Sequence, residues 1–511
     1  MSIAIVGGGV AGCYAAYRLR DAYAECVDIY EMSDRVGGRL WSAKLKGVAA
    51  PIELGGMFFS TLHENAHGLI TKELKLPHSQ VNWSRRNQFL RGKYLDDDDY
   101  ADPGKVPYNL VGAEAKLSPE ALLVHVLGLI VPDFKSLWPI SQTPPASPRA
   151  TFEHLRRLRH EGRPLYDCGF WNVLNDIASN EAYQLLTVTL GSVGLFRNSN
   201  AFDAVWNLMQ EFGQQQFFKI DAGYQSLPQT LWDACADKVG RHLEHRLVRV
   251  DRAAHGLLLT FITPAGPQRR VADSLILAMP RRALQLIDFG DGVFDDAEGF
   301  ARLRDESVDP APACKVFMAF DRPWWDESVV GPASLTGADV SAAYTDLPMQ
   351  QCYYFGVPQA GAPAVLMAAY ADDTSSGFWR GLMHPSEPLC QNPVQDVPVA
   401  LNCSSALAET ARRQLDVLHD DIDVPTPSGA VFFDWNCDPF GGGWHAWSPR
   451  VRSWEVRKQI RNPAPGLYIC GEAYAERHGW VDGAVNSAEM VLRCLGLGRP
   501  DWVDVNYEFE R

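Results

Sequence analysis

The sequence predicts an α/β fold whose first domain is a doubly wound (Rossmann-like) parallel sheet, and three observations predict it. A short apolar run over residues 3–6 leads directly into the motif Gly7-x-Gly9-x-x-Gly12. A stretch with helical spacing follows, and a second strand-like run over residues 27–30 ends on Glu31. The last hundred residues return to the same pattern of strand, glycine turn and helix. This order is the fingerprint of a dinucleotide-binding βαβ unit.

Each glycine of the first motif has a physical role. Gly7 permits the tight turn, Gly9 lets the backbone approach a pyrophosphate, and Gly12 lets the helix pack closely on the strand. The N-terminus of that helix presents N–H groups and a positive dipole end to phosphates. Glu31, about twenty residues further on, is placed to accept hydrogen bonds from an adenosine ribose.

A second glycine pair helps to choose between NAD and FAD, which the first motif leaves open. Gly37 and Gly38 stand directly before Arg39, a few residues after the ribose acid. Such a turn gives another close backbone approach, and the arginine adds a charge-assisted donor for phosphate oxygens. This segment favours FAD.

The composition excludes several classes of protein. A chain of 511 residues predicts two or three domains. The formal net charge of −15 argues against nucleic-acid binding and favours a cationic substrate over an anionic one. We find no run of about twenty apolar residues and no room for a signal peptide before Ile3, so we expect no membrane association. The 11 cysteines lack CxxC or metal spacing, which indicates free thiols in a reducing, cytoplasmic compartment and no metal site.

The chain is organised in three regions, two of them discontinuous in sequence. We expect an FAD-binding domain, a mixed-sheet substrate domain and a helical subdomain. The FAD-binding domain comprises residues 1–75, 215–300 and 430–497. The substrate domain comprises 76–104 and 301–429, and the helical subdomain comprises 105–214. Helix-length stretches at 119–131, 170–180 and 201–212 define the helical subdomain, and proline-rich loops are expected at 141–148 and 384–401.

With both ends in view, the chain resembles the flavin-dependent amine oxidase superfamily, and within it the L-amino-acid oxidases. The resemblance covers nearly the whole length. In chain order its motifs are residues 7–12, Glu31 with 35–39, 53–57, 223–228, Lys315, 345–348 with Tyr353 and Tyr354, 441–447, 471–472 and 479–484. It implies bound FAD in the three-region fold described above. Dimers are common in this family, so a homodimer is the assembly that the resemblance suggests.

The resemblance also implies which residues hold FAD. From the adenine end to the flavin end, they are Val248 (through its backbone) and Glu31, then Arg39, Gly471 and Glu472, and at the isoalloxazine Gly56, Met57, Trp480 and Val481, with Ala484 in the same motif as Trp480.

Members of this family oxidise a C–N bond. A neutral amine loses hydride to the flavin, water hydrolyses the resulting imine to a carbonyl compound and ammonia, and oxygen reoxidises the flavin to give hydrogen peroxide. The protein has to orient the substrate and exclude bulk water. A monooxygenase giving oxidative decarboxylation and a flavin-binding scaffold without turnover stay open as alternatives.

Five residues are candidates for contact with the reacting groups. The resemblance implies that Lys315 points at flavin N5 through a water and that Tyr354 hydrogen-bonds a substrate carboxylate. Trp447 and Trp480 are candidate aromatic walls near the flavin, and His445 is a candidate polar wall residue. Because side chains alternate along a strand, Tyr353 would face away from Tyr354.

One departure from the family pattern concerns the substrate carboxylate. L-amino-acid oxidases carry an arginine at the position of Phe58, where it clamps the α-carboxylate through two hydrogen bonds. Phenylalanine cannot donate, and a carboxylate buried without a partner is costly. Either another cation replaces the arginine (Arg85, Arg86 and Arg91 are the nearest downstream) or the substrate has no free α-carboxylate there. The second option favours an amine, a polyamine or a modified amino acid.

Overall fold

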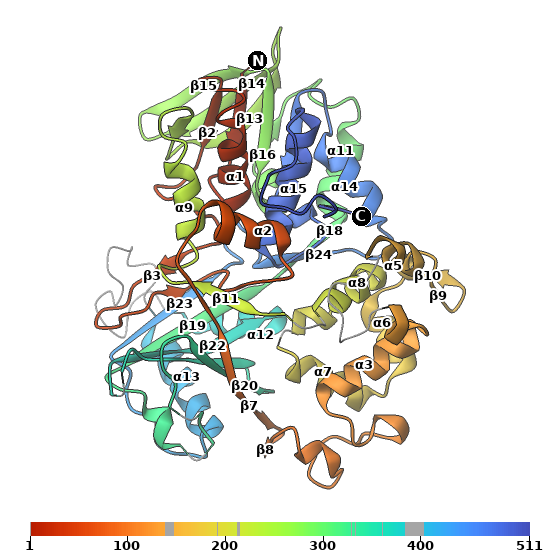
Figure 1. Cartoon of the computed structure of the whole chain (residues 1–511), viewed down its shortest axis with the longest axis vertical. Coiled ribbons are helices and arrows are strands. Elements are labelled where there is room, and N and C mark those ends of the chain that lie inside the picture. The colour runs from red at the N-terminus through yellow and green to blue at the C-terminus, as the bar shows by residue number, and fades with distance from the viewer. Residues whose placement is uncertain are drawn as a thin grey trace.

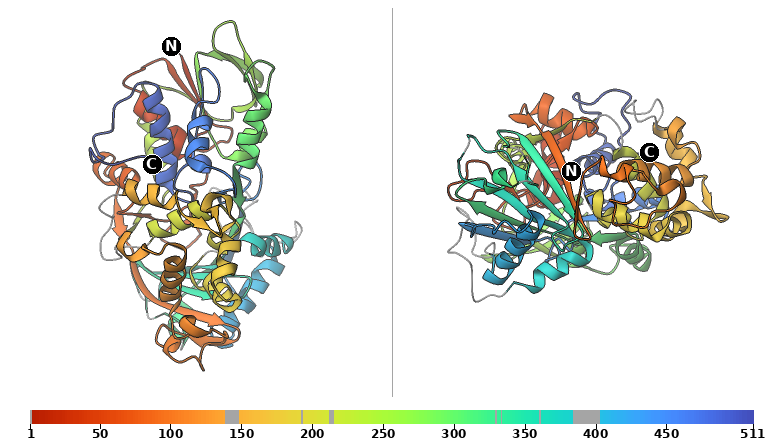
Figure 2. Two further views of the ribbon diagram at one scale, coloured as in Figure 1. Left: turned by 90° about the vertical axis from the view of Figure 1, so that its right-hand side faces the viewer. Right: turned by 90° about the horizontal axis from the view of Figure 1, so that it is seen from below.

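The computed structural model describes residues 2–137, 148–191, 193–211, 215–328, 330–332, 334–359, 361–383 and 403–511. It has a parallel sheet with its helices at the top of Figure 1, a large mixed sheet at the lower left and a group of helices at the lower right. The molecule is elongated along the axis that joins the first region to the other two (Figure 2). The loops expected at 141–148 and 384–401 lie outside the described residues, except for Pro148, which begins a helix.

The parallel sheet is built from three separated parts of the chain. In spatial order its strands are β12 (Gly240–His242), β2 (Val27–Tyr30), β1 (Ile3–Val6), β16 (Ser274–Ala278) and β25 (Leu467–Cys470). All four pairings are parallel. The first and last segments of the chain therefore meet across one sheet, as a doubly wound α/β fold requires.

Side-chain alternation along β1 divides the core between the two faces of this sheet. Ile3 and Ile5 pack with helices, whereas Ala4 and Val6 pack toward a second sheet. The helices on the first face are α1 (Val10–Leu19), α2 (Glu64–Gly68), α9 (Ser226–Asp233) and α15 (Val481–Cys494). Both faces are covered, so β1, β2, β16 and β25 are mostly buried and apolar, whereas the edge strand β12, with Arg241 and His242, is partly exposed.

A four-stranded sheet and three helices cover the second face. They are β15 (Gly266–Ala272), β14 (Leu257–Thr263), β13 (Arg246–Arg252) and β17 (Asp288–Phe289), with α10 (Arg281–Gln285), α11 (Ala297–Glu306) and α14 (Ser453–Arg461). The apolar stretch 271–280 reads as a single strand in the sequence, but the chain turns at Asp273, whose carboxylate accepts a hydrogen bond from the Ser2 N–H. Residues before the turn belong to β15 and those after it to β16.

The mixed sheet has seven strands and carries the substrate-side wall. In spatial order they are β23 (Gly429–Asp434), β19 (Ala313–Phe320), β22 (Ala364–Asp372), β21 (Gln351–Phe355), β20 (Asp339–Thr345), β7 (Asn82–Leu90) and β8 (Lys93–Leu95). One face packs on α12 (Asp373–Gly381) and α13 (Ser405–Leu418). The other face carries an aromatic cluster and looks toward the parallel sheet.

The helical region forms its own core. Its helices are α3 (Pro119–Ile130), α4 (Phe134–Leu137), α5 (Pro148–Leu155), α6 (Phe170–Ile177), α7 (Asn180–Thr189) and α8 (Ala201–Glu211). Ser118 caps α3 and Ser179 caps α7, each accepting a hydrogen bond from an N–H in the first turn. The last helix, α8, is buried along nearly its whole length and leads back to β11 (Phe217–Ile220) beside the other two regions (Figure 1).

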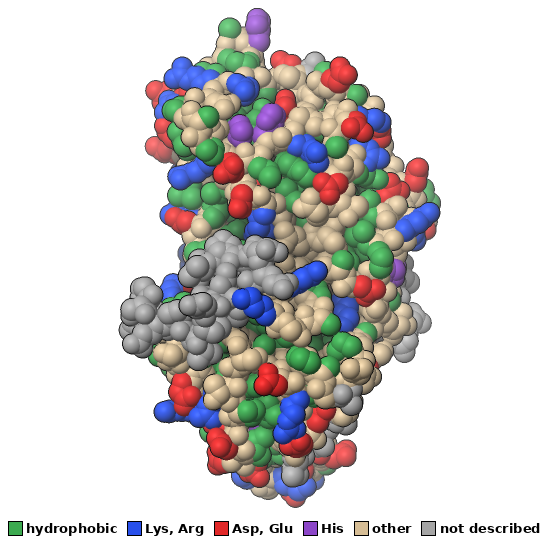
Figure 3. Space-filling model, turned by 90° about the vertical axis from the view of Figure 1, so that its left-hand side faces the viewer, with side chains coloured by type: hydrophobic (Ala, Val, Ile, Leu, Met, Phe, Trp, Pro, Cys, Tyr) green, Lys and Arg blue, Asp and Glu red, His purple; other side chains and the backbone are tan. Residues whose placement is uncertain are grey.

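Three surface and composition features bear on function. No helix in the described part of the chain is both long and apolar enough to cross a bilayer. The ten cysteines among the described residues are all free. On the face drawn in Figure 3, acidic and basic side chains are interspersed rather than separated by sign.

Candidate active site

The glycine turn after β1 is tight enough to exclude side chains. Gly7 adopts a φ of +115°, and a Cβ there would lie 2.3 Å from the Ala278 carbonyl oxygen. A Cβ on Gly12 would lie 1.9 Å from the Gly7 carbonyl oxygen, so α1 packs directly on the turn. No side chain caps the start of α1 and no acid stands in its first turn. That helix end is therefore suited to an anionic ligand.

A cavity of about 1200 Å³ extends from this turn to the inner face of the seven-stranded sheet. Its volume exceeds the range of about 300–1000 Å³ that is usual for drug-sized ligands. The residues from the cofactor prediction that line it are Gly7, Gly9, Glu31, Arg39, Gly56, Gly471, Glu472, Trp480, Val481 and Ala484, and Lys315 lines it too. Segments from both ends of the chain thus converge on one space.

The remaining three cofactor candidates do not line the cavity. Gly12 has the packing role just described. Met57 packs in the aromatic cluster of the mixed sheet, next to Gly56, which does line the cavity. Val248 sits where the pairing of β13 with β14 is irregular, and its neighbours Arg246 and Leu247 line the cavity instead.

Glu31 is held in place at the adenosine end. Its carboxylate accepts hydrogen bonds from the Gly8 N–H at 2.5 Å and from the Ser33 N–H at 2.9 Å. The side chain is 9% exposed, so it lies at the wall of the cavity rather than on the outer surface. A carboxylate fixed in this way is preorganised to accept ribose hydroxyls.

A buried ionic network lies midway along the cavity. Glu472 pairs with Arg39 at 2.8 Å and accepts hydrogen bonds from the His445 and Gly479 N–H groups, both at 2.9 Å. His445 Nδ1 also lies 2.9 Å from this carboxylate. Burial alone would raise the pKa of Glu472, but Arg39 and His445 outweigh it and hold the pKa well below the usual range. Arg39 is therefore fixed at the wall with its charge beside the cavity.

Lys315 lies at the far end, on β19. Its Nζ donates to the Gly55 carbonyl at 2.5 Å and to the Glu53 carbonyl at 3.0 Å, and lies 4.9 Å from the Tyr370 ring centroid. Burial lowers the pKa of Lys315 to about 7, partly opposed by the Glu53 carboxylate, and burial raises the pKa of Glu53 to about 7. A lysine in this state can exchange a proton near neutral pH.

Aromatic side chains form the walls around Lys315. Tyr370, Trp435, Trp444 and Trp480 all line the cavity. The indole of Trp480 also contacts two rings outside the cavity lining: its centroid lies 4.3 Å from that of His63 and 6.3 Å from that of Phe217. Such walls exclude water and suit a flat ring system with an apolar substrate beside it.

Two of the predicted wall residues, His445 and Trp447, face away from the cavity. On β24 (Trp444–Trp447), side chains alternate, and Trp444 lines the cavity. His445 points behind the wall to Glu472, and Trp447 packs in the core of the parallel-sheet region, 5.4 Å from the His478 ring. The tryptophan of this strand that lines the cavity is therefore Trp444 and not Trp447, and His445 holds the Glu472 carboxylate in place.

Tyr354 is also corrected. It is buried on the outer side of the mixed sheet, where its hydroxyl lies 2.7 Å from His419 Nε2 and its ring packs on Trp325. Tyr353 projects to the inner side, in the aromatic cluster that includes Phe58 and Trp83. The predicted alternation between the two tyrosines holds, but the face assigned to each was inverted.

Phe58 packs among aromatic rings, with its ring 5.6 Å from that of Trp83. Of the three arginines proposed as substitutes for the missing clamp, Arg91 is paired with Glu181 at 2.7 Å on an exposed edge. The side chains of Arg85 and Arg86 lie outside the described part of the structure. Among the described residues, the ring contact of Phe58 is with Trp83, and none of the cation–π contacts involves it.

Sequence reasoning missed several residues of the site. Alternation in 444–447 makes Trp444 the alternative to Trp447, and Tyr370 is the one hydroxyl-bearing ring in the buried strand 364–372. Glu53 begins the motif 53–57, in which the resemblance implies a role only for Gly56 and Met57. Glu211, whose carboxylate accepts a hydrogen bond from Trp480 Nε1 at 2.9 Å, ends a helix and has no local signal.

The fold and the cavity define a dinucleotide-binding protein of the α/β class, with a buried lysine and aromatic walls at one end of the cavity. Comparison with known proteins gives the particular family. The family model for flavin containing amine oxidoreductase matches residues 10–491, so the chain belongs to that family and binds FAD.

Individual relatives match over nearly the full length. The chain is 27% identical to Aplysianin-A of Aplysia kurodai, covering 96% of this chain and 90% of the relative. It is 26% identical to Achacin of Lissachatina fulica (96% and 92%) and 24% identical to the L-amino-acid oxidase of Mus musculus (98% and 72%). A solved structure of putrescine oxidase bound to putrescine is similar in fold, with a TM-score of 0.68 at 17% identity over 97% of this chain and 99% of that one.

Proposed function

We propose that this FAD-dependent enzyme oxidises the C–N bond of an L-amino acid or an amino-acid derivative, giving an imine that water hydrolyses to a carbonyl compound and ammonia. Bound FAD would accept the hydride and pass electrons to oxygen, which yields hydrogen peroxide. The observation that carries the proposal is the placement of Lys315, buried with a lowered pKa at the aromatic end of the cavity. The similarity to an L-amino-acid oxidase over almost all of this chain supports it.

The residues of the chain have separable tasks in this proposal. Glu31 holds the ribose, and Arg39, fixed by Glu472, lies beside the pyrophosphate. Trp444 and Trp480 exclude water and orient the substrate. Lys315 moves a proton at its Nζ, because it can be either charged or neutral near pH 7.

A second candidate substrate class follows from Phe58. Its described ring neighbour Trp83 offers only a neutral indole N–H, which has no hydrogen-bond partner, and no charge to pair with an α-carboxylate. A carboxylate buried without a countercharge is costly. An amine or polyamine that lacks this carboxylate would avoid that cost. The same chemistry would then give an aldehyde in place of a keto acid.

The test is a peroxide assay on the purified holoprotein with the twenty common L-amino acids and a set of simple amines and polyamines. We expect peroxide and ammonia in equal amounts from at least one compound. Product analysis separates a keto acid or aldehyde from the amide that a monooxygenase would release. No peroxide and no flavin reduction with any compound would overturn the proposal.

A further inference from the structure

Two sequence motifs, residues 53–57 and 223–228, meet at a partly buried carboxylate beside the cavity. The carboxylate belongs to Glu53, the last residue of β4 (Ile52–Glu53). It accepts hydrogen bonds from the Tyr224 N–H at 2.7 Å and from the Ser42 hydroxyl at 2.8 Å. Ser42 begins β3 (Ser42–Ala43), which pairs with β4, and it lines the cavity.

The turn at 223–225 fixes this carboxylate in place. Gly223 adopts a φ of +96°, and a Cβ there would lie 2.5 Å from Ser42 Oγ and 3.3 Å from Glu53 Oε1. Glycine leaves room for both groups at this backbone angle. The Gln225 N–H donates to Ser42 Oγ at 3.0 Å, and the hydroxyl in turn donates to Glu53. The turn, the serine and the carboxylate therefore form one continuous hydrogen-bonded unit.

The same residue holds Lys315 through its main chain. Lys315 Nζ donates to the Glu53 carbonyl at 3.0 Å and to the Gly55 carbonyl at 2.5 Å. The carbonyl between these two, that of Leu54, accepts a hydrogen bond from the indole N–H of Trp435 at 2.7 Å, and Trp435 lines the cavity. The segment 53–55 is thus tied to the cavity wall at every residue, and it holds the ammonium of Lys315 there.

The described strands beside Lys315 place no charge on it. Lys315 is paired across the sheet with Tyr370 of β22, whose hydroxyl stays neutral because burial raises its pKa. The acids of the two neighbouring strands are Asp372 on β22 and Asp434 on β23, and both act on Cys314. Cys314 packs on the outer side of the sheet, whereas Lys315 lines the cavity. The charge that acts on Lys315 has to come from another segment.

That charge is the Glu53 carboxylate. Burial lowers the pKa of Lys315 to about 7, and Glu53 is the group that opposes this shift. In return, Lys315 lowers the pKa of Glu53 against a larger effect of burial. Tyr224 adds no charge of its own, because burial raises the pKa of its hydroxyl well above the usual value. Lys315 and Glu53 therefore titrate as a coupled pair, in which each charge stabilises the other.

We propose that Glu53 is a positioning residue for Lys315: its carbonyl holds the ammonium at the cavity wall, and its carboxylate, fixed by Ser42 and the 223–225 turn, keeps that ammonium protonated for the reaction with oxygen. The inference rests on the proposed function. Hydrogen peroxide forms from oxygen with two electrons and two protons; the reduced flavin supplies both electrons and one proton, and Lys315 supplies the second proton at its Nζ. The amine that remains regains its proton from water.

The test follows reoxidation of the flavin by oxygen in the holoenzyme, on both sides of pH 7, after photochemical reduction so that no substrate is needed. The wild-type rate should fall as pH rises through about 7, where the ammonium is lost. Glu53→Gln has nearly the same shape and keeps an acceptor for the Tyr224 N–H, but it carries no charge. We expect the fall to move to lower pH by about one unit, because loss of a neighbouring negative charge makes the ammonium less stable.

The visible absorbance of the oxidised flavin, titrated with pH in the resting enzyme, should show the same displacement, because a charge near the ring tunes its electronic state. Glu53→Asp, which keeps the charge, should retain the wild-type profile. In the Lys315→Met background Glu53→Gln should change nothing further, because the group on which it acts is gone. Glu298→Gln, at an exposed position of α11, is the matched control.

Ser42→Ala gives a second route to the same answer, should Glu53→Gln not fold. It removes one of the two donors to the carboxylate, which favours neutral Glu53, so the fall should move in the same direction by a smaller amount.

A profile that stays in place or moves to higher pH in these variants overturns the inference. A wild-type rate that does not change around pH 7, or a displacement that persists in the Lys315→Met background, overturns it as well. These results leave the proposed function standing, because no amine is oxidised in this experiment; failure of the compound panel above is what overturns that function.

Discussion

At the scale of single residues, Lys315 is the clearest case in which burial changes the pKa of a side chain at the candidate site. Its side chain is 3% exposed, and both of its hydrogen-bond acceptors are main-chain carbonyls of the 53–55 segment. Carbonyls solvate an ammonium without supplying a full countercharge, so the proton is held less tightly than in water. The lysine therefore lies at the boundary between its charged and neutral forms at neutral pH.

Replacing this lysine should slow reoxidation of the flavin. We expect Lys315→Met to lower the rate constant with oxygen about a hundredfold, the usual effect of losing a positioned proton donor. The ammonium predominates below about pH 7 and the amine above it, so the wild-type rate should fall as pH rises through 7. The rate of the variant should not change with pH in this range, as measured by stopped-flow mixing of the reduced enzyme with oxygen. Lys458→Met, on an exposed position of α14, is the control. An unchanged rate and pH profile would remove Lys315 from the chemistry.

Phe58 is the residue that says most about the substrate, because it stands where L-amino-acid oxidases carry an arginine. Restoring an arginine should create a donor for the α-carboxylate, so Phe58→Arg should raise the preference for L-lysine over cadaverine, the amine that lacks its α-carboxylate, by about tenfold or more. Phe58→Met, which stays apolar, should leave the ratio as it is. The measurement is kcat/KM for both compounds in the two variants. A ratio that does not move in Phe58→Arg would show that the carboxylate is bound elsewhere.

At the scale of elements, the first strands and the helices of the helical region could be predicted, but the face of a strand could not. The pattern of residues 3–31 predicts β1, α1 and β2 because glycine and apolar spacing are local signals. On β21 and on β24 a large aromatic side chain stands on each face, Tyr353 opposite Tyr354 and Trp444 opposite Trp447. Alternation therefore separates the two members of each pair but does not say which one faces the site. A shift of one residue inverts the assignment, and it did so for Tyr354 and Trp447.

The assignment on β24 can be tested with a matched pair. Trp444→Phe should change the flavin spectrum and raise KM, because Trp444 lines the cavity. Trp447→Phe should leave both unaltered but lower the free energy of unfolding by about 1–3 kcal/mol, since a large buried side chain is truncated. Absorbance spectra, kinetics and denaturant unfolding check the two variants. The reverse pattern would mean that the faces were assigned correctly from the sequence.

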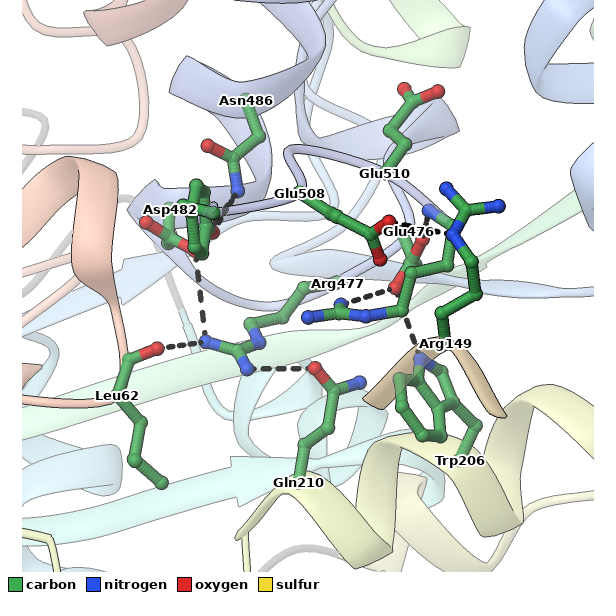
Figure 4. Close-up of polar contacts among 12 residues, drawn as sticks. Leu62, Arg149, Trp206, Gln210, Glu476, Arg477, Asp482, Asn486, Glu508 and Glu510 are labelled. Atoms are coloured by element: carbon green, nitrogen blue, oxygen red, sulfur yellow. Dashed lines mark hydrogen bonds and ion pairs between the residues drawn. The ribbon is translucent and has the colours of Figure 1, made fainter. Parts of the chain in front are cut away.

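At the scale of the whole molecule, buried ion pairs connect segments that lie far apart in the sequence. Glu476 pairs with Arg457 at 2.7 Å and with Arg511 at 2.9 Å and accepts a hydrogen bond from the Trp206 indole, so it joins α14, the C-terminal segment and α8. Arg477, Gln210 and Asp482 lie beside it (Figure 4). No local pattern in the sequence indicates such a cluster, because its members lie up to about three hundred residues apart.

Breaking this cluster should destabilise the fold. Burial alone would raise the pKa of Glu476, but Arg457 and Arg511 outweigh it and hold the pKa at about 2. The stabilisation is therefore complete above the unfolded-state pKa of about 4.5 and is lost as pH falls through 2. We expect Glu476→Gln to cost roughly 3 kcal/mol at neutral pH, because it leaves Arg457 buried without its full countercharge.

Denaturant unfolding of wild type and variant, repeated between neutral pH and pH 3, checks this prediction. The difference between the two proteins should narrow as the pH falls below 4.5. Glu455→Gln, which breaks the exposed pair with Arg452, should have no measurable effect. A difference that is constant with pH would mean that charge is not what stabilises the cluster.

How much of the site could be predicted also depends on scale. The convergence of residues 7–12, Lys315 and 471–484 on one cavity followed from motifs that each end of the chain carries. The contacts of Glu211 and the alternation of Trp444 with Trp447 depend on how three regions pack together, which no single segment encodes. The departure at Phe58 was visible in the sequence, yet its aromatic surroundings were not.

The most direct test of the central claim, that an amine reduces a flavin held between both ends of this chain, is the visible absorbance of the purified holoprotein on anaerobic addition of L-lysine and cadaverine. The account predicts that at least one of them bleaches the flavin fully and that admitting oxygen restores the colour with one equivalent of peroxide. A flavin that stays oxidised with both compounds and with the full amino-acid and amine panel would contradict it.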